Sequence, residues 1–110
     1  MELKNKVVVV TGSTRGYGYA IAESFLEAGS LVAITGRSQK AVDSSLTSLQ
    51  LKGRVSGFVM DVREEEQVYK LVDDVIKEFG CIDIWVNNAG YSNAAGMMLD
   101  IDPQDALDMF

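Results

Sequence analysis

Three glycines fall within eight residues directly after four consecutive valines, in the stretch TGSTRGYG at positions 11–18. Gly12, Gly16 and Gly18 follow the spacing G-x-x-x-G-x-G, which differs from the G-x-G-x-x-G of the standard dinucleotide fingerprint. Glycine at this density is unfavourable unless the backbone must turn tightly or approach another group closely. We expect Gly12 to permit the turn, Gly16 to let the backbone approach a pyrophosphate, and Gly18 to let the next helix pack on the sheet.

Helix-forming sequence follows this turn, so the first N–H groups of a helix are expected beside whatever the turn binds. Unpaired N–H groups and the helix dipole attract an anion, and the hydroxyls of Ser13 and Thr14 are expected to add donors. The alternative is a glycine-rich turn that binds no ligand. A P-loop is excluded because Tyr19 and Ala20 follow Gly18, where that motif needs a lysine and a hydroxyl residue.

The residues after the second predicted strand indicate which dinucleotide fits. An NAD site, like an adenosyl-methionine site, is expected to place a carboxylate there for the ribose hydroxyls. Positions 35–38 read Thr-Gly-Arg-Ser, without a carboxylate. Arg37 offers a planar, permanently charged fork suited to a phosphate, and Arg15 can supply a second charge. We therefore predict NADP (NADPH) as the cofactor; the alternative for each arginine is a solvated loop charge.

The apolar pattern alternates between strand and helix periods along the chain. Strands are expected at 6–11, 31–35, 55–60 and 82–86, and helices at 16–28, after Ser38, up to Phe79 and from Asp102. This alternation predicts right-handed crossovers between parallel strands. The predicted fold class is α/β, the N-terminal half of a Rossmann-type doubly wound parallel sheet with strand order 3-2-1-4. The glycine turn and residues 87–90 are then expected at the same crevice.

Local signals predict where several elements begin and end. Ser38 is expected to cap the second helix, and Gly80 to end the third. Asp61 precedes Glu64 by three residues, an arrangement that resembles a capping box for the third helix. After the fourth strand we expect a loop that runs through Met98.

The composition is typical of one small acidic domain. Ten basic and sixteen acidic side chains among 110 residues give a net charge of −6, which disfavours nucleic acid and anionic membrane surfaces as partners. No segment approaches the roughly 18 apolar residues that span a bilayer, so we expect a cytoplasmic protein, or a plastid one if a transit peptide has been removed. Cys81 lacks a histidine to activate it and is expected to be a buried thiol at the start of a strand. No metal site is expected.

Three motifs in register resemble those of one family. TGSTRGYG resembles the T-G-x-x-x-G-x-G of the short-chain dehydrogenase/reductase family, residues 87–90 resemble its N-N-A-G, and Asp61-Val62 resembles its adenine-contacting segment. Their order and separations match over essentially the whole chain. The resemblance implies an NADP-dependent oxidoreductase of the carbonyl reductase or alcohol dehydrogenase type.

The resemblance also implies roles for individual residues. Around the phosphates it places Gly12, Ser13, Thr14, Arg15, Gly16, Tyr17 and Gly18, with Arg37 at the 2′-phosphate. Asp61 would bond the adenine amine, with helix capping as an alternative or additional role, and Val62 would lie beside the ring. The ribose side of the cofactor would be lined by Asn88, Ala89 and Gly90. Asn87 would be partly structural, because it would help to hold the fourth strand.

Two features refine the resemblance. Tyr17 stands where the family usually has isoleucine, and its ring could crowd the nicotinamide face, offer it a hydroxyl or serve in packing. Within the family, the runs at 12–16 and 82–90, with Ser92-Asn93 soon after, are similar to chlorophyll(ide) b reductases.

The family's catalytic Tyr-x-x-x-Lys pair, which supplies the proton to the carbonyl oxygen, does not occur in this sequence. The residues four positions after the tyrosines are not lysines: they are Ile21, Glu23, Asp73 and Ala95. We therefore assign no catalytic residue. We expect residues 1–110 to be an NADP-binding Rossmann domain, truncated before the catalytic segment and inactive alone, whose fourth strand has an unpaired edge.

A non-catalytic dinucleotide-binding module or sensor is the alternative to an enzyme. For the enzyme, the expected partner is a small-molecule carbonyl or alcohol substrate. The full-length form is expected to be a homo-oligomer without a transmembrane segment.

Overall fold

The structure, a computed structural model, describes residues 2–88 and the backbone of residues 97–100. Its strands form one sheet in the order β3-β2-β1-β4-β5. They are β1 (Val7–Val10), β2 (Leu31–Gly36), β3 (Val55–Val59), β4 (Ile84–Asn87) and β5 (Met97–Asp100). The helices are α1 (Gly16–Glu27), α2 (Gln39–Leu49) and α3 (Glu65–Phe79). None of these helices has the length and apolar character that crossing a membrane requires.

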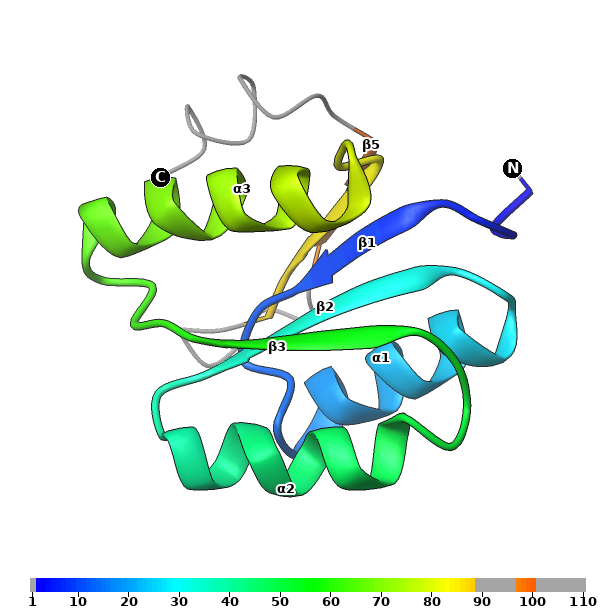
Figure 1. The fold of residues 1–110 in the computed structure, drawn as a ribbon, viewed down its shortest axis with the longest axis horizontal. Coiled ribbons are helices and arrows are strands. Elements are labelled where there is room, and N and C mark those ends of the chain that lie inside the picture. Colours follow the sequence, from blue (N-terminus) through cyan, green and yellow to red (C-terminus); the bar gives the residue numbers. More distant parts are fainter. Residues whose placement is uncertain (1, 89–96, 101–110) are drawn as a thin grey trace.

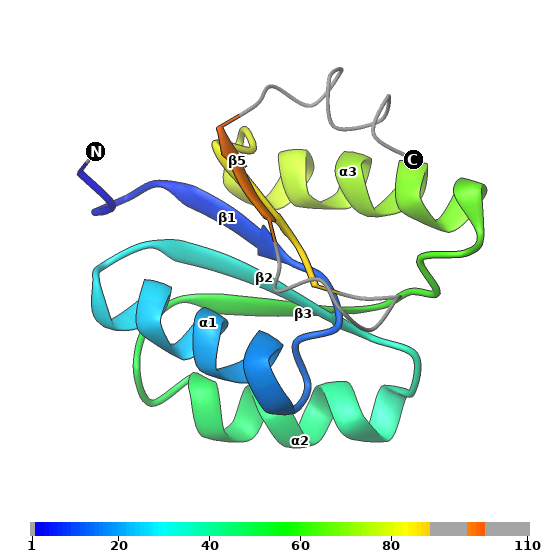
Figure 2. The ribbon, with the colours of Figure 1, turned by 180° about the vertical axis from the view of Figure 1, so that it is seen from behind.

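The first four strands form the predicted parallel sheet. β1 pairs in parallel with β2 and with β4, and β2 pairs in parallel with β3, which confirms the order 3-2-1-4. Helices α1 and α2 cover one face of the sheet and α3 covers the other (Figure 1, and from behind in Figure 2). Right-handed crossovers explain this arrangement, because the chain moves outward from β1 to β3 and then returns past β1 to β4. All four carboxyl ends therefore lie at one edge of the sheet.

The valines of β1 divide between two apolar layers. Val7 and Val9 belong to the core cluster under α3, whereas Val8 and Val10 belong to the cluster under α1 and α2. Successive strand residues point to opposite faces, so a strand covered on both sides reads as a continuous β-branched run. Trp85 of β4 is fully buried in the layer under α3.

Two of the three predicted helix ends are confirmed. The Ser38 hydroxyl accepts a hydrogen bond from the Ala41 N–H at 3.2 Å, and Gly80 ends α3 in the left-handed conformation, with φ of 93°. The predicted capping box of Asp61 and Glu64 is wrong. α3 begins one residue after Glu64, and the Asp61 carboxylate accepts hydrogen bonds from Arg63 instead of capping the helix.

The predicted loop through Met98 and the unpaired edge of the fourth strand are also wrong. β5 pairs with β4 in antiparallel orientation, with Ile84 opposite Asp100 and Asn87 opposite Met97. Pairing of this kind satisfies backbone groups that β4 would otherwise leave open at its edge. The helix predicted from Asp102 lies outside the described residues.

Cys81 is exposed, so the expectation of a buried thiol at the start of a strand is wrong. It precedes β4 by three residues, and the buried apolar residue at this end of the strand is Ile82 instead. Partial burial, together with the neighbouring Asp83 carboxylate, raises the pKa of the Cys81 thiol. Both influences favour the protonated, less reactive form.

Helix α2 approaches β3 closely at Gly57. A Cβ at this position would lie 2.5 Å from Val42 Cγ1 and 2.9 Å from Leu46 Cδ1. Because Val42 is buried and stiff at χ1, we expect Gly57→Ala to lower the free energy of unfolding by about 1–3 kcal/mol. Denaturant unfolding measures this change.

The matched control for this substitution is Gly53→Ala. A Cβ at Gly53 would meet the flexible end of Leu26 at 3.3 Å, so the expected change is about 0.5 kcal/mol or less. Equal effects of the two substitutions would contradict the close packing of α2 on β3.

Candidate functional site

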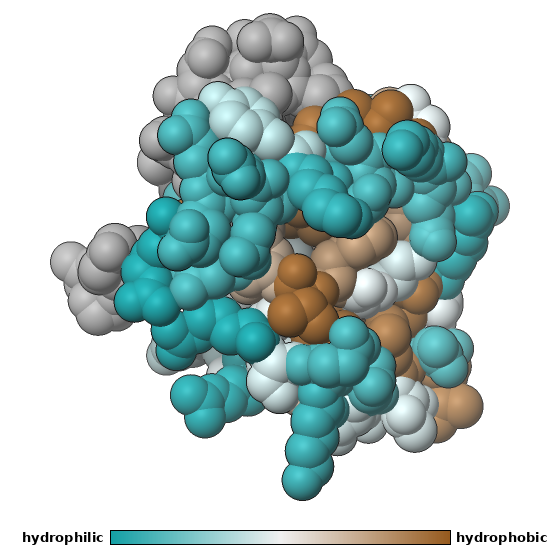
Figure 3. Space-filling model, turned by 60° about the vertical axis from the view of Figure 1, so that its left-hand side comes forward, coloured by the Kyte–Doolittle hydropathy of each residue, from teal (hydrophilic) through white to brown (hydrophobic). Residues whose placement is uncertain are grey.

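A hollow of about 370 Å³ opens at the carboxyl ends of the parallel strands. Three connections line it: the glycine turn after β1 and the segments after β2 and β3. Six of the predicted site residues are among its lining: Gly12, Thr14, Arg15, Arg37, Asp61 and Val62. Figure 3, which brings this side forward, shows apolar surface at the centre of a mainly hydrophilic face. Ligands of doubly wound folds bind at this end of the sheet.

The glycine turn is fixed to the end of β2 by several hydrogen bonds. The Ser13 N–H donates to the Thr35 carbonyl at 2.9 Å, and the Gly12 N–H donates to Thr35 Oγ1 at 3.1 Å. The Ser13 hydroxyl donates to the Val10 carbonyl at 2.7 Å and accepts from the Thr35 N–H at 3.0 Å. Ser13 is fully buried and its hydroxyl braces the turn, so its expected role as a ligand donor stays a prediction.

A second set of contacts brings Thr14 against the end of β2. The Ser45 hydroxyl, on α2, donates to the Thr14 carbonyl at 3.0 Å. A Cβ at Gly36 would lie 2.5 Å from Thr14 Cγ2, so a side chain at position 36 would have to displace the Thr14 side chain. This close approach places Arg15, which follows Thr14, and Arg37, which follows Gly36, on the same hollow.

The N-terminus of α1 is suited to an anion. Its N-cap residue is Arg15, and within the described part of the chain no side chain caps it and no acid lies in its first turn. By contrast, Ser38 caps α2, and two glutamates lie in the first turn of α3. The first N–H groups of a helix have no intrahelical partner. Apart from its chain neighbours and the nearby backbone of α1 itself, no described atom lies within 4 Å of a Cβ placed at Gly16, so a ligand can approach this backbone.

Asn88 holds the glycine turn against the end of β4. Its Nδ2 donates to the Gly12 carbonyl at 3.1 Å, and its N–H donates to Thr11 Oγ1 at 2.9 Å. The Thr11 hydroxyl also lies 3.4 Å from Asn87 Oδ1. The described residues of NNAG, Asn87 and Asn88, therefore contact the turn, but neither lines the hollow. That the turn and NNAG face one crevice stays a prediction. Ala89 and Gly90 lie outside the described residues.

Tyr17 does not line the hollow at the strand ends. The residue is 83% exposed. It lies beside a second hollow of about 340 Å³ along α1, together with Leu3, Ile21 and Phe25. A contact between Tyr17 and a nicotinamide ring therefore stays a prediction.

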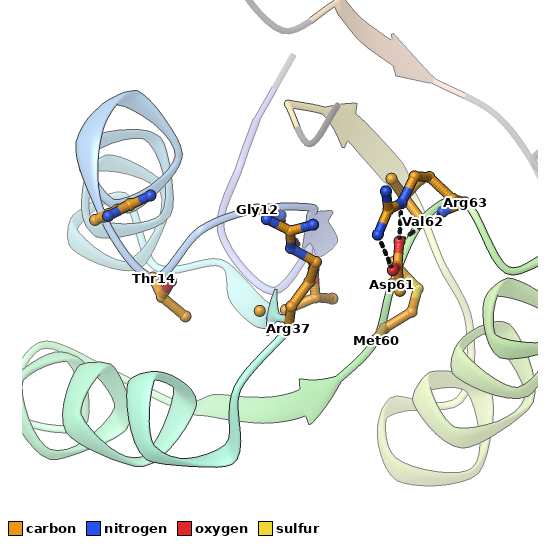
Figure 4. Close-up of a pocket in the computed structure, with 10 residues that line it drawn as sticks. Gly12, Thr14, Arg37, Met60, Asp61, Val62 and Arg63 are labelled. Atoms are coloured by element: carbon orange, nitrogen blue, oxygen red, sulfur yellow. Dashed lines mark hydrogen bonds and ion pairs between the residues drawn. The ribbon is translucent and has the colours of Figure 1, made fainter. Parts of the chain in front are cut away.

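Gly36, which leaves room beside Arg37, also lines the hollow, whereas three further lining residues were assigned no role from the sequence: Thr35, Met60 and Arg63. Of these, Arg63 alters the electrostatics most, because its guanidinium pairs with the Asp61 carboxylate at 2.8 Å (Figure 4). Hydrogen bonds from the Arg63 side chain and N–H lower the pKa of Asp61 to about 2, with a smaller contribution from the charge of Arg37. An arginine two residues after a strand-end aspartate is a local signal that could have identified the pair.

Positive charge is in excess around the hollow. Among the described lining residues, Arg15, Arg37 and Arg63 bring three guanidinium groups, against the single carboxylate of Asp61. The whole chain has a net charge of −6. The hollow is therefore a region of local positive charge on an acidic protein, and guanidinium groups are donors suited to charge-assisted hydrogen bonds with phosphate.

A parallel sheet of order 3-2-1-4, with a glycine turn and an uncapped helix N-terminus at its carboxyl edge, defines a Rossmann-type nucleotide-binding fold. Comparison with known families makes this class more specific. The short chain dehydrogenase family matches residues 6–110, and the chain belongs to this family of oxidoreductases.

Individual relatives agree with this assignment. A 3alpha-hydroxysteroid dehydrogenase of Mediterraneibacter gnavus is 41% identical over 97 residues, covering 86% of this chain and 39% of that protein. The chlorophyll(ide) b reductase NOL of Oryza sativa subsp. japonica is 49% identical over 90 residues, covering 79% of this chain and 26% of that protein. This relative confirms the similarity to chlorophyll(ide) b reductases.

Solved structures give the same fold. L-Sorbose reductase from Gluconobacter frateurii, complexed with NADPH and L-sorbose, is similar with a TM-score of 0.77 and 38% identity, covering 86% of this chain and 38% of that protein. The chain thus spans between 26% and 39% of the length of these three proteins.

Proposed function

We propose that this chain is the cofactor-binding part of an NADP-dependent oxidoreductase that acts on a small-molecule carbonyl or alcohol. The observation that carries the proposal is the segment after β2, where Arg37 stands at the hollow and no carboxylate accompanies it. A 2′-hydroxyl needs a carboxylate there, whereas a 2′-phosphate needs an arginine. The NADPH complex of the related L-sorbose reductase supports this choice.

The described residues fit such a cofactor in three parts. The uncapped N-terminus of α1 and the open backbone at Gly16 would hold the pyrophosphate. Arg15 and Arg37 would hold the 2′-phosphate, and the segment of Asp61 and Val62 would contact the adenine. A cofactor bound in this way would supply or accept a hydride through its nicotinamide, and these residues would hold its phosphates and its adenine.

We assign the substrate only to the class of carbonyls and alcohols. By their names, the three relatives act on a steroid, on chlorophyll(ide) b and on L-sorbose, so they support no single compound. A chlorophyll(ide) b reductase-like activity is the narrower form of the proposal, supported by the 49% identity to NOL.

A direct binding titration tests the proposal. Because one or more charge-assisted hydrogen bonds distinguish the cofactors, we expect NADPH to bind at least about tenfold more tightly than NADH. Isothermal titration calorimetry of the purified protein measures both dissociation constants. Equal affinities, or no binding of either compound, would contradict the proposal.

Gly16→Ala is expected to weaken NADPH binding by about tenfold or more, because its methyl group would occupy the approach to the pyrophosphate. The substitution also strains the backbone, since φ is +63° at Gly16, and this strain is expected to lower stability by about 1–2 kcal/mol. Calorimetry and denaturant unfolding separate the two effects.

Gly80→Ala is the matched control for this substitution. Gly80 has φ of +93° and similarly open space for a Cβ, but it lies at the C-terminus of α3, outside the lining of the hollow. The control should lose comparable stability and keep its NADPH affinity. A comparable loss of affinity in both variants would contradict the pyrophosphate role of Gly16.

A further inference from the structure

Arg63 binds the Asp61 carboxylate through both its side chain and its backbone. The guanidinium donates from Nε to Oδ1 at 3.0 Å and from Nη2 to Oδ2 at 2.8 Å, and the Arg63 N–H donates to Oδ1 at 3.0 Å. Figure 4 shows this pair on the opposite side of the hollow from Thr14, with Arg37 between them in the view. The paired, two-point geometry fixes the plane of the carboxylate.

The backbone of Asp61 is held as well. Its N–H donates to Gln67 Oε1 at 2.8 Å, and its carbonyl accepts from the Glu64 N–H at 2.9 Å. Gln67 lies on α3, so the carboxylate has a fixed position relative to that helix and to the end of β3. The Asp61 side chain is 22% exposed, while that of Arg63 is 62% exposed.

This geometry leaves little hydrogen-bonding capacity on Asp61. A carboxylate offers about four acceptor positions, and the described contacts of Arg63 use two on Oδ1 and one on Oδ2. Among the contacts of the described residues, one acceptor position therefore remains, on Oδ2. An ionised carboxylate can accept but not donate, so that position suits an N–H group of a ligand and repels a carbonyl oxygen.

We propose that Arg63 is a positioning residue that makes the base end of the hollow selective for adenine over a base with a carbonyl group at the same place. The clamp on Asp61 leaves the remaining acceptor of Oδ2 for the exocyclic amine of adenine, which hypoxanthine replaces with a carbonyl. Arg37, from the neighbouring segment, serves the phosphate instead. This inference rests on the proposed function, because it needs a dinucleotide in the hollow.

The test compares two ligands that differ at the base alone: NADPH and reduced nicotinamide hypoxanthine dinucleotide phosphate. Calorimetry gives both dissociation constants for the unchanged protein, for Arg63→Ala and for Arg63→Lys. The unchanged protein should favour adenine by about tenfold, the value of one charge-assisted hydrogen bond. Arg63→Ala should reduce this preference to about threefold or less. Arg63→Lys, which keeps the positive charge but not the two-point guanidinium geometry, should give an intermediate preference.

The matched control is Arg54→Ala. Arg54 is an exposed arginine that lies over the Phe79 ring, 5.0 Å from its centroid, and does not line the hollow. This variant should keep the base preference of the unchanged protein. Carbon-13 NMR of the Asp61 carboxyl adds a second readout: Arg63→Ala should raise its pKa from about 2 toward 3.8.

Each outcome separates this inference from the proposed function. If the unchanged protein binds neither ligand, the proposed function is wrong. If it binds NADPH but Arg63→Ala keeps the base preference, or weakens both ligands equally, Arg63 does not position Asp61 for adenine and the inference is wrong. If Arg63→Ala fails to fold, Arg63→Lys decides by the same ratio.

Discussion

Replacing Arg37 with aspartate is expected to reverse the cofactor preference, so that NADH binds more tightly than NADPH. The substitution removes a guanidinium from the hollow and introduces a carboxylate, which repels a 2′-phosphate and accepts a hydrogen bond from a 2′-hydroxyl. Loss of the charge-assisted hydrogen bonds should weaken NADPH by about 10–100-fold. Calorimetric titration of both cofactors measures the ratio.

The charge change itself needs a control, because the chain is already acidic. Arg54→Asp changes the net charge by the same amount at an exposed position outside the lining of the hollow. It should leave the ratio of the two affinities unchanged. If Arg37→Asp also leaves the ratio unchanged, Arg37 does not contact the 2′-phosphate.

Gly18→Ala is expected to cause the largest loss of stability among single methyl additions in the glycine turn. A Cβ at Gly18 would lie 2.3 Å from the Gly12 carbonyl oxygen, 2.6 Å from Asn88 Nδ2 and 2.9 Å from Ser13 Cα. Two of these atoms belong to the backbone of the turn and cannot move aside as a side chain could. We expect a loss of about 3 kcal/mol or more, measured by denaturant unfolding.

The same substitution should also weaken NADPH binding, because Asn88 and Gly12 would be forced apart at the crevice. Gly53→Ala again serves as the control, because a Cβ there would come no closer than 3.3 Å to a neighbouring atom, the Cδ2 of Leu26. A Gly18→Ala protein as stable as this control would contradict the close approach of α1 to the turn.

The fold was largely predictable because its signals are local. Buried parallel strands appear as β-branched runs, and α3 has apolar residues at regular helical spacing. The order of these elements, together with right-handed crossovers, then predicts the strand order of the sheet. β5 was missed because a strand at an edge is defined by its partner. Its sequence, Met-Met-Leu-Asp, has neither β-branched residues nor strict alternation.

The sequence predicted which arginines lie at the site, but it did not predict which hydroxyl and carboxylate groups bond to the protein itself. Arg15 and Arg37 were placed on the hollow from their spacing relative to the strands. Hydroxyl and carboxylate groups can satisfy either a ligand or the protein itself. The Ser13 hydroxyl bonds to Val10 and to Thr35 of β2, and the Asp61 carboxylate pairs with Arg63 two residues further along the chain. The residue types alone do not select these partners over a ligand.

The most direct test of the 2′-phosphate assignment is a crystal structure of this protein with NADPH. We expect oxygens of the 2′-phosphate to lie about 3 Å from guanidinium nitrogens of both Arg37 and Arg15. A bound NADPH whose 2′-phosphate faces solvent and contacts neither arginine would contradict the account.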